Sequence, residues 1–409
     1  MLSNLAGIAV TFFYILLSEL FRKPEIATWA DNALINVLTC LVFMVVAATI
    51  SYRGMEATKS VQYVLVAFQL GVLVLFSCMA LYKAYAHGGV NAFDRTPFSW
   101  EWFNPFGVGS FSAFAAGIAL SVFIYWGWDV VLTMTEETKG SHNTPGKAAT
   151  LTIFLVVSLY QLISIGVISY SGTSDGELGL ANPAIHDNIF AVLAGPVMGP
   201  LAILMALAVL GSSAASLQST FISPARTMLA MGFYGALPPR FAKVDPKFQS
   251  PSTATIASAF VAFIFYAVMR MISEAVLWDT ITALGMMVCF YYAITAFACV
   301  WYLRKQAVES FRNMLMKCIL PAIGGVLLMI FFVQTSYDAM DPSYGSGSEI
   351  FGLGLVFVLG AVVLISGVFV MLLTWWKNPE FFRSRGTLKR GLPDEDTPLA
   401  TVDEAFDLQ

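Results

Sequence analysis

Long apolar stretches alternate with short polar ones along most of the chain. Ten of them are long enough to be considered as membrane-spanning helices, which need roughly 20 apolar residues each. They lie at 4–20, 33–51, 60–83, 110–135, 147–170, 198–232, 252–273, 276–303, 315–336 and 350–376. Apolar residues also extend upstream of the sixth stretch to Ile189, so we expect a short interfacial piece before that span. The pattern predicts an all-α polytopic membrane protein of about ten helices.

The fourth stretch contains an interruption that an ordinary membrane helix would not carry. From Val122 to Asp129 it reads VFIYWGWD, with a glycine between two tryptophans and a carboxylate at the end. Gly127 weakens a helix, and Asp129 costs about 3 kcal/mol at the bilayer centre on insertion scales. Interrupted helices at membrane depth are tolerated where protein or a cavity surrounds the freed backbone groups, and in transporters they form substrate sites. The segment therefore indicates a solute carrier.

Composition and charge agree with this interpretation. Of the 409 residues, 58% are hydrophobic and 12% are charged, and the mean hydropathy is +0.74. This charged fraction is about half that of a soluble protein. If the N-terminus is cytoplasmic, 17 of the 22 Lys and Arg residues fall on the cytoplasmic side and 5 on the other. Positive residues accumulate on that side, so the bias predicts a multi-pass protein of the cytoplasmic membrane with both termini inside.

The chain divides into a transmembrane permease domain at 1–376 and a cytoplasmic tail at 377–409. The tail starts basic and turns acidic at 394–396, a polar composition that predicts disorder. The five cysteines have no metal-type spacing. The three histidines all lie in loops, at His87, His142 and His186. We therefore expect no metal site, no cofactor and no nucleic-acid partner.

Three motifs, in order, resemble those of the amino acid–polyamine–organocation (APC) superfamily. The run VFIYWGWD, followed by EETKGSHNTP at 136–145, is similar to the superfamily's sixth helix and the loop after it. Residues 223–251, SPARTMLAMGFYGALPPRFAKVDPKFQSP, resemble its eighth helix and following loop. Residues 51–65, SYRGMEATKSVQYVL, are similar to the connection between its fourth and fifth helices. The resemblance extends to about residue 376.

The resemblance implies a leucine-transporter-like fold of two inverted five-helix repeats. With 110–135 as the superfamily's sixth helix, only three spans precede it, so the chain would hold helices three to twelve. The glycine-rich first helix, which receives the substrate carboxylate in this fold, has no counterpart before residue 33. Two explanations stay open. Either the sequence is truncated, which we favour, or the protein is a shortened member that lacks half of its site.

The resemblance also assigns a substrate site to the interrupted segment. Backbone carbonyls freed between Ile124 and Gly127 are expected to accept hydrogen bonds from a substrate ammonium. Phe123, by its place in the motif, is expected to close over the substrate as a gate, and cation–π contact would favour an amine. The expected members are Phe123, Ile124, Tyr125, Trp126, Gly127 and Trp128. The alternative is that these aromatic side chains only pack against neighbouring helices.

Five polar positions have both a structural and a functional interpretation. Ser212 and Ser216 lie in a small-residue patch that either lets helices approach closely or offers hydroxyl oxygens to substrate or Na⁺. Asp129 either caps the second half-helix or pairs with the substrate, and Glu136 is either a solvated helix end or part of a gate. Gln69 either bonds to neighbouring helices or takes part in coupling. Some proton-coupled APC members resemble this stretch but carry Lys there. Because Gln has no titratable proton, a lysine-based proton switch is not expected.

The combined prediction is a secondary transporter of amino acids or small organic amines that works by alternating access. Coupling to H⁺ or Na⁺, or exchange with a second substrate, drives it, and membrane lipids surround it. One alternative is a truncated, non-transporting remnant or a membrane subunit. Another is an integral-membrane transferase or hydrolase, which would need converging carboxylates, a His–Asp set or a metal cluster. Three histidines and acidic residues that lie mostly in loops speak against an enzyme.

Overall fold

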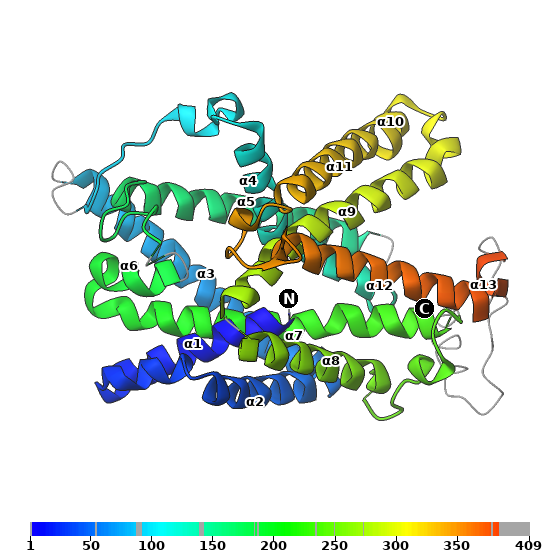
Figure 1. Ribbon diagram of the computed structural model, residues 1–409, viewed down its shortest axis with the longest axis horizontal. Coiled ribbons are helices and arrows are strands. Elements are labelled where there is room, and N and C mark those ends of the chain that lie inside the picture. Colours follow the sequence, from blue (N-terminus) through cyan, green and yellow to red (C-terminus); the bar gives the residue numbers. More distant parts are fainter. Residues whose placement is uncertain are drawn as a thin grey trace. The chain divides into compact units, whose positions relative to one another are not determined.

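The computed structural model is helical over most of its described residues (Figure 1). It forms two compact units. The first comprises Met1–Phe98, Asp129–Val268 and Val370–Gln409, and the second comprises Ser99–Trp128 and Met269–Phe369. The structure describes residues 2–53, 55–86, 92–138, 143–183, 185, 188–233, 235–248, 250–272, 274–377 and 379–383. The tail predicted to be disordered lies almost wholly outside these residues.

The elements of the first unit are mostly long helices. They are α1 (Leu2–Phe21), α2 (Ala33–Tyr52), α3 (Met55–Tyr85), α5 (Thr144–Ser171), α6 (Ile189–Met198), α7 (Ala202–Phe233), most of α8 (Ser252–Ile272), and α13 (Pro379–Arg383). Short 3-10 helices lie at Pro24–Ala30, Gly199–Leu201 and Pro239–Ala242. A further 3-10 helix, Trp128–Glu137, has its first residue in the second unit and its other residues in the first.

The second unit combines helices with a small hairpin. Its helices are α4 (Phe111–Ile124), α9 (Glu274–Ala307), α10 (Phe311–Met314), α11 (Leu320–Asp338) and most of α12 (Leu355–Lys377). A π-helix at Leu315–Ile319 joins α10 to α11, and 3-10 helices lie at Trp100–Phe103, Pro105–Gly107 and Pro342–Tyr344. Strands β1 (Glu349–Ile350) and β2 (Leu353–Gly354) pair antiparallel, with Glu349 opposite Gly354.

All ten predicted segments contain a helix. Among the described residues, eight helical stretches are long and apolar enough to cross a membrane, with Ile189–Phe233 counted as one. The segments predicted at 4–20 and 110–135 contain the shorter apolar helices Leu5–Phe21 and Phe111–Ile124. The last predicted span began too early. Residues 350–354 belong to the hairpin, and the helix begins at Leu355.

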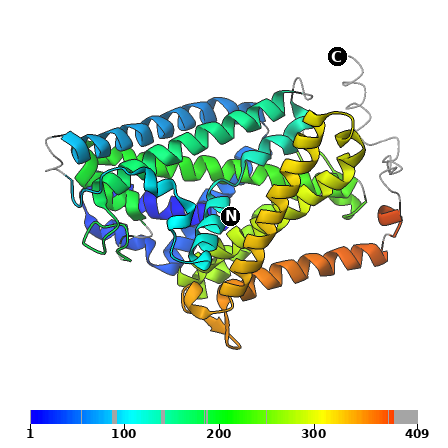
Figure 2. The same ribbon diagram turned by 90° about the horizontal axis from the view of Figure 1, so that it is seen from above.

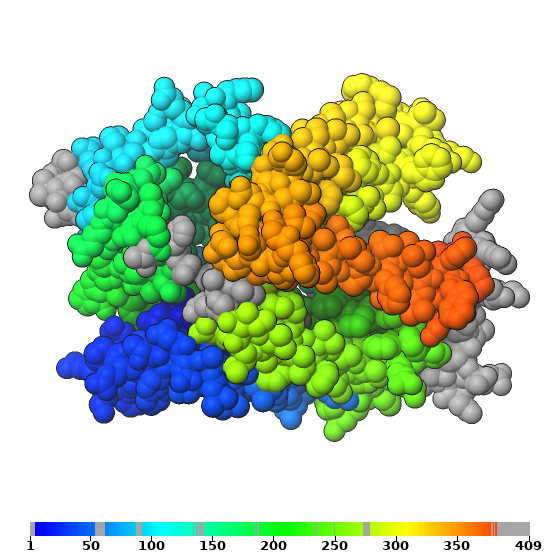
Figure 3. Space-filling view, viewed as in Figure 1, coloured from blue at the N-terminus to red at the C-terminus, as the bar shows by residue number. Residues whose placement is uncertain are grey.

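Helix α7 organises the first unit. It packs along α1, α2 and α3, and α3 packs in turn against α5, which runs beside it in Figure 2. Phe76 of α3, Leu193 of α6 and Met205 of α7 are fully buried in the shared core. The side chains of α1 and α2, blue in Figure 3, lie against each other. These helices bury part of their apolar surface against one another, and many of their large apolar side chains stay exposed.

The short piece expected before the sixth span is present as α6. A side chain of α3 donates a hydrogen bond to a backbone carbonyl in the last turn of α6. The carbonyl of Pro196 would accept a hydrogen bond from the backbone N–H of residue 200 in a continuing helix, but residue 200 is proline and has none. Lys83 Nζ donates to this carbonyl instead, at 2.6 Å. A lysine from another helix therefore replaces the missing backbone donor.

Helices α1, α2 and α8 meet at a buried hydrogen bond. The hydroxyl of Tyr266, which is 1% exposed, donates to Asn36 Oδ1, and Asn36 Nδ2 donates to the carbonyl of Ala30 at 2.8 Å. A Cβ at Gly7 would lie 3.0 Å from the Tyr266 hydroxyl oxygen, so α1 passes directly over this ring. The amide and the phenol satisfy each other inside the unit.

Two motifs that are far apart in the sequence contact each other at the C-terminal end of α2. The Tyr52 hydroxyl donates to Asp245 Oδ2 at 2.6 Å, and Ser250 Oγ donates to the Tyr52 carbonyl at 2.8 Å. Backbone N–H groups of Lys247 and Phe248 donate to Asp245 Oδ1. The Tyr52 hydrogen bond, more than the backbone ones, holds the pKa of Asp245 below its usual range.

In the second unit, α9 lies between α4 and α11, and α9 and α11 run side by side in Figure 2. Rings of Phe290 and Phe332 join α9 to α11 with centroids 5.0 Å apart. Asp279 of α9 is buried and accepts hydrogen bonds from the backbone N–H and the hydroxyl of Ser346. This carboxylate thereby holds the loop that precedes the hairpin.

We expect Tyr266→Phe to destabilise the protein in detergent by about 1–3 kcal/mol, because it leaves the buried Asn36 oxygen without its donor. Thermal or denaturant unfolding followed by circular dichroism measures this. Tyr302→Phe is the matched control, since Tyr302 is 84% exposed and should tolerate the change. Equal stability of the two variants would contradict the role of the Asn36–Tyr266 bond.

The Tyr52–Asp245 contact should make stability depend on pH. Because the folded pKa of Asp245 is lowered, the contact stabilises the protein above the unfolded pKa, near 4. That contribution is lost as the pH falls through the folded pKa. We expect Tyr52→Phe to lower the unfolding temperature at neutral pH, and the difference from the unchanged protein to shrink below about pH 4. Tyr63→Phe, at an exposed tyrosine of α3, is the control. A difference that stays constant down to acid pH would refute the linkage.

Candidate functional site

The predicted interruption of the fourth apolar segment is present. Ser110 caps helix α4, because its Oγ accepts a hydrogen bond from the Ala113 N–H at 3.1 Å, and the last residue of the helix is Ile124. The next backbone groups make short-range bonds, from Tyr125 N–H to the Ser121 carbonyl and from Trp126 N–H to the Phe123 carbonyl. Gly127 then takes φ +112°, and the chain continues as the 3-10 helix Trp128–Glu137.

The backbone conformation at Gly127 explains why this turn has a glycine. A φ of +112° lies in a region that residues with a side chain rarely adopt. A Cβ built at Gly127 would also meet no atom within 4 Å, so open space lies beside the backbone here. The turn is therefore set by backbone conformation and not by crowding.

Helix α9 approaches the end of α4 very closely. A Cβ at Gly285 would lie 2.7 Å from the carbonyl oxygen of Ala119 and 3.6 Å from Phe123 Cβ. Only glycine fits this position. The residues of α9 that follow Gly285 therefore lie close to the interruption that follows α4. The close approach of the two helices follows from this small residue.

Tyr291 and Tyr292 of α9 complete an aromatic cluster at the interruption. Trp126 Nε1–H donates to the Tyr291 hydroxyl oxygen at 2.7 Å, and the Phe123 ring lies 6.5 Å from the Trp126 ring. The Trp128 and Tyr292 rings lie 6.0 Å apart, and the two tyrosine rings 4.4 Å apart. All five side chains are half-buried. We define Phe123, Trp126, Trp128, Tyr291 and Tyr292 as the aromatic cluster.

Sequence reasoning did not single out the two tyrosines. Their signal was available, because two adjacent tyrosines interrupt an otherwise apolar span in the run CFYYA at 289–293. Tyrosine in a membrane helix carries a hydroxyl that needs a partner. What the sequence could not indicate was that the partner of the Tyr291 hydroxyl is the Trp126 indole, 165 residues away.

The remaining predicted residues of the segment lie around the turn. Ile124 is exposed, and Tyr125 and Gly127 are half-buried. Asp129 lies in the first turn of the 3-10 helix, where a negative charge is favourable near the helix N-terminus. The side chain of Glu136 lies outside the described residues.

Gln69, Ser212 and Ser216 belong to the first unit, whereas the aromatic cluster belongs to the second. Ser212 and Ser216 lie within the unbroken helix α7, and both are half-buried. Gln69 lies on α3, and its Oε1 is buried without a hydrogen-bond partner among the described residues. Both interpretations of Gln69, bonding to neighbouring helices and a part in coupling, stay predictions.

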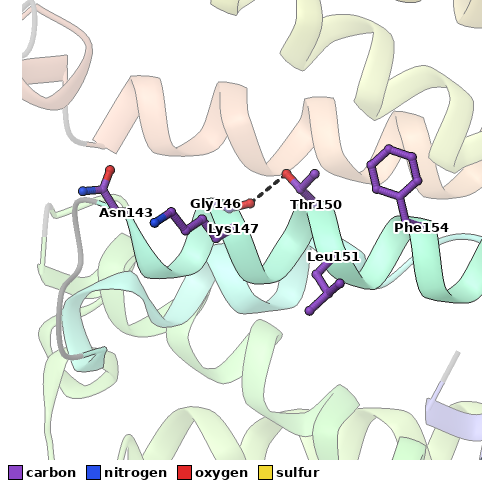
Figure 4. A pocket seen from close by; sticks show the side chains of 6 residues that line it. All are labelled: Asn143, Gly146, Lys147, Thr150, Leu151 and Phe154. Atoms are coloured by element: carbon purple, nitrogen blue, oxygen red, sulfur yellow. Dashed lines mark hydrogen bonds between the residues drawn. The ribbon is translucent and has the colours of Figure 1, made fainter.

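A surface depression of about 520 Å³ lies along the first turns of α5 (Figure 4). Its lining comes from this one helix and the residue that precedes it: Asn143, Gly146, Lys147, Thr150, Leu151 and Phe154. The Thr150 hydroxyl donates to the Gly146 carbonyl at 2.9 Å, a bond within the helix. Polar groups do not converge here from several elements, so the interrupted segment is the better candidate for a binding site.

Comparison with known proteins gives a family match and several related proteins. The model of a family described as "Amino acid permease" matches residues 1–358. A methylthioribose transporter of Bacillus subtilis (strain 168) is 26% identical over 237 residues, covering 56% of this chain and 45% of that protein. The branched-chain amino acid permease BcaP of the same organism is 27% identical over 257 residues, covering 60% of this chain and 50% of that protein.

A vacuolar cationic amino acid transporter 4 of Arabidopsis thaliana is also similar, with 24% identity over 255 residues. The match covers 61% of this chain and 39% of that protein. The matched part of this chain thus spans half or less of the length of these relatives. All three are named as transport proteins.

Gly127→Ala should destabilise the protein by about 1–3 kcal/mol, because alanine is strained at φ +112° even with open space around it. Gly117→Ala, within α4, is the matched control. A Cβ there also meets open space but the backbone is helical, so we expect no loss of stability. Unfolding in detergent, monitored by circular dichroism, compares the two. Equal effects would show that the interruption does not depend on Gly127.

Proposed function

This chain belongs to the amino acid permease family, and we propose that it carries an amino acid or a small organic amine across a membrane by alternating access. The observation that carries the proposal is the interruption after Ile124, lined by the aromatic cluster. Discontinuous helices form the substrate sites of many secondary transporters, because their ends present unpaired backbone groups to a ligand.

The C-terminal end of α4 suits the ammonium group of such a substrate. The last carbonyls of a helix form the negative end of its dipole, and α4 ends at Ile124 beside open space at Gly127. We assign the substrate ammonium to the carbonyls between Ile124 and Gly127. Phe123, at the last turn of α4, serves as the ring that closes over it.

The aromatic cluster supplies the second attraction. Faces of Trp and Tyr rings attract cations, by about 0.5–2 kcal/mol depending on solvent exposure. The Trp126–Tyr291 hydrogen bond fixes the orientation of one such ring, so less rotational freedom is lost when a substrate binds. The cluster therefore favours a positively charged group at this level of the helix.

Two of the three relatives support an amino acid as the substrate class, and the third is named for methylthioribose. One of these two relatives is named for branched-chain amino acids and the other for cationic amino acids. These substrates share an ammonium and a carboxylate but differ in their side chains. A site built from backbone carbonyls and aromatic rings would recognise the shared ammonium group. The side-chain preference would then be set by residues around the cluster.

Transport is driven by H⁺, by Na⁺ or by exchange. Gln69 has no titratable proton, which speaks against a lysine-type proton switch at this position. Hydroxyl oxygens of Ser212 and Ser216 are the candidates for contacting substrate or Na⁺. Asp129 and Glu136 are the candidates for gating, at the two ends of the 3-10 helix.

We place the permease domain at 1–376 in the cytoplasmic membrane, with both termini and the tail at 377–409 in the cytoplasm. The support is the distribution of Lys and Arg, of which 17 of 22 fall on one side of the ten segments. The family match over 1–358 covers nearly all of the proposed domain.

Uptake by the purified chain in vesicles tests this proposal. We expect Trp126→Phe and Tyr291→Phe each to raise KM for a radiolabelled amino acid roughly three- to tenfold. This factor corresponds to the free energy of one hydrogen bond. The double variant should do little more than either single one, because both remove the same bond. Tyr302→Phe, at an exposed tyrosine of the same helix, is the control.

Two outcomes would contradict the proposal in different ways. Unchanged KM in all variants, with uptake intact, would reject the site but keep the function. A chain that neither takes up nor binds any amino acid or amine of the panel would reject the function and favour a non-transporting membrane subunit.

A further inference from the structure

A short segment ahead of α4 carries large aromatic side chains on its surface. It consists of the 3-10 helices Trp100–Phe103 and Pro105–Gly107, drawn in cyan before α4 in Figure 1. Trp100 is 81% exposed, Phe103 48% and Phe106 93%. We call residues 99–107 the aromatic segment. An exposed apolar surface of this kind marks a contact with a membrane or another molecule.

The backbone of the aromatic segment satisfies much of its own hydrogen bonding. Ser99 Oγ accepts from the Glu101 N–H at 3.2 Å, and Asn104 Oδ1 accepts from the Phe106 N–H at 3.0 Å. N–H groups of Trp102, Asn104 and Gly107 donate to carbonyls three residues earlier. A segment with its donors paired in this way can leave bulk water at low cost.

The aromatic segment also lies next to the N-terminal end of the apolar helix α4. Two residues separate Gly107 from Ser110, which caps α4, so at roughly 3.5 Å per residue the segment ends within about 10 Å of that cap. The first turn of α4 is itself held on α11, because Ser112 Oγ donates to Asp338 Oδ2 at 2.6 Å. The Phe111 ring of α4 also stacks on the Phe331 ring of α11, with centroids 6.3 Å apart.

We propose that the aromatic segment binds the headgroup region of the lipid bilayer at the N-terminal end of α4. Trp rings concentrate at this level of a membrane, where an apolar ring and a polar N–H are both accommodated. Glu101 is the one charged residue among residues 99–107. The contact anchors the capped end of α4 in the interface, at the opposite end of the helix from the interruption at Gly127.

Depth-dependent fluorescence quenching tests the contact. The full chain is placed in phosphatidylcholine vesicles that contain lipid brominated either near the headgroup or near the end of the acyl chain. The difference in emission between the unchanged protein and Trp100→Phe isolates Trp100. We expect shallow bromines to quench this component at least twice as strongly as deep ones, and aqueous iodide to quench it weakly.

A second variant pair tests whether the aromatic side chains make the contact. Replacing Trp100 and Phe106 together by Ser should reduce shallow quenching of Trp102 at least twofold, while the helical circular dichroism signal is kept. Phe351→Ser is the control, because Phe351 is fully exposed at the hairpin turn of another loop and should leave Trp102 unaffected.

Three outcomes would overturn the proposal. Strong iodide quenching with none from either lipid would place Trp100 in water. Stronger quenching by deep bromines would place it within the hydrocarbon and not at the interface. Emission that varies with the protein-to-lipid ratio, without lipid quenching, would show that a second copy of the chain covers the surface. None of these results depends on transport.

Discussion

Every backbone N–H and C=O of a membrane-spanning segment needs a partner within the protein, because hydrocarbon offers none. The chain meets part of this constraint at two interruptions of its helices. After Ile124, the N–H groups of Tyr125 and Trp126 turn back to carbonyls of α4. At the end of α6, where proline removes the next donor, Lys83 of α3 bonds to the Pro196 carbonyl. At one interruption the helix's own carbonyls accept the hydrogen bonds, and at the other a neighbouring helix supplies the donor. The carbonyls between Ile124 and Gly127 are the groups that we assign to the substrate.

The same constraint governs polar side chains inside the helical units. Tyr266 and Asn36 join α8 to α2, and Asp279 of α9 holds Ser346 of the loop before the hairpin. Each pair satisfies groups that would be costly to bury alone. Such pairs also fix which faces of the helices meet, since the alternative packings would leave a buried donor or acceptor without a partner.

The candidate site combines an interrupted helix with a hydrogen-bonded pair of side chains. Gly285 lets α9 approach α4 to the distance at which Tyr291 accepts from the Trp126 indole. The interruption then presents carbonyls and aromatic rings at the same level of the unit. Its position could be predicted, because glycine between tryptophans followed by aspartate is incompatible with a regular membrane helix. Tyr291 and Tyr292 were not predicted as part of the site, because the pattern of apolar residues does not show which neighbouring helix faces a given residue. The start of the last helix was misplaced for a local reason, since residues 350–354 are apolar enough for a span but pair as a hairpin.

The order of the amino acids was enough to predict the helical class, the location of the ten apolar segments, the interruption at Gly127 and the family resemblance. These depend on local length, hydropathy and residue order, which act over a few turns of chain. The tertiary structure decided which polar groups pair, where α9 touches α4, and that Gln69 Oε1 is buried without a partner in the described residues. The partners are 165 residues apart at Trp126–Tyr291 and 230 apart at Asn36–Tyr266. Contacts at such separations follow from how whole helices pack, a property that no local pattern contains.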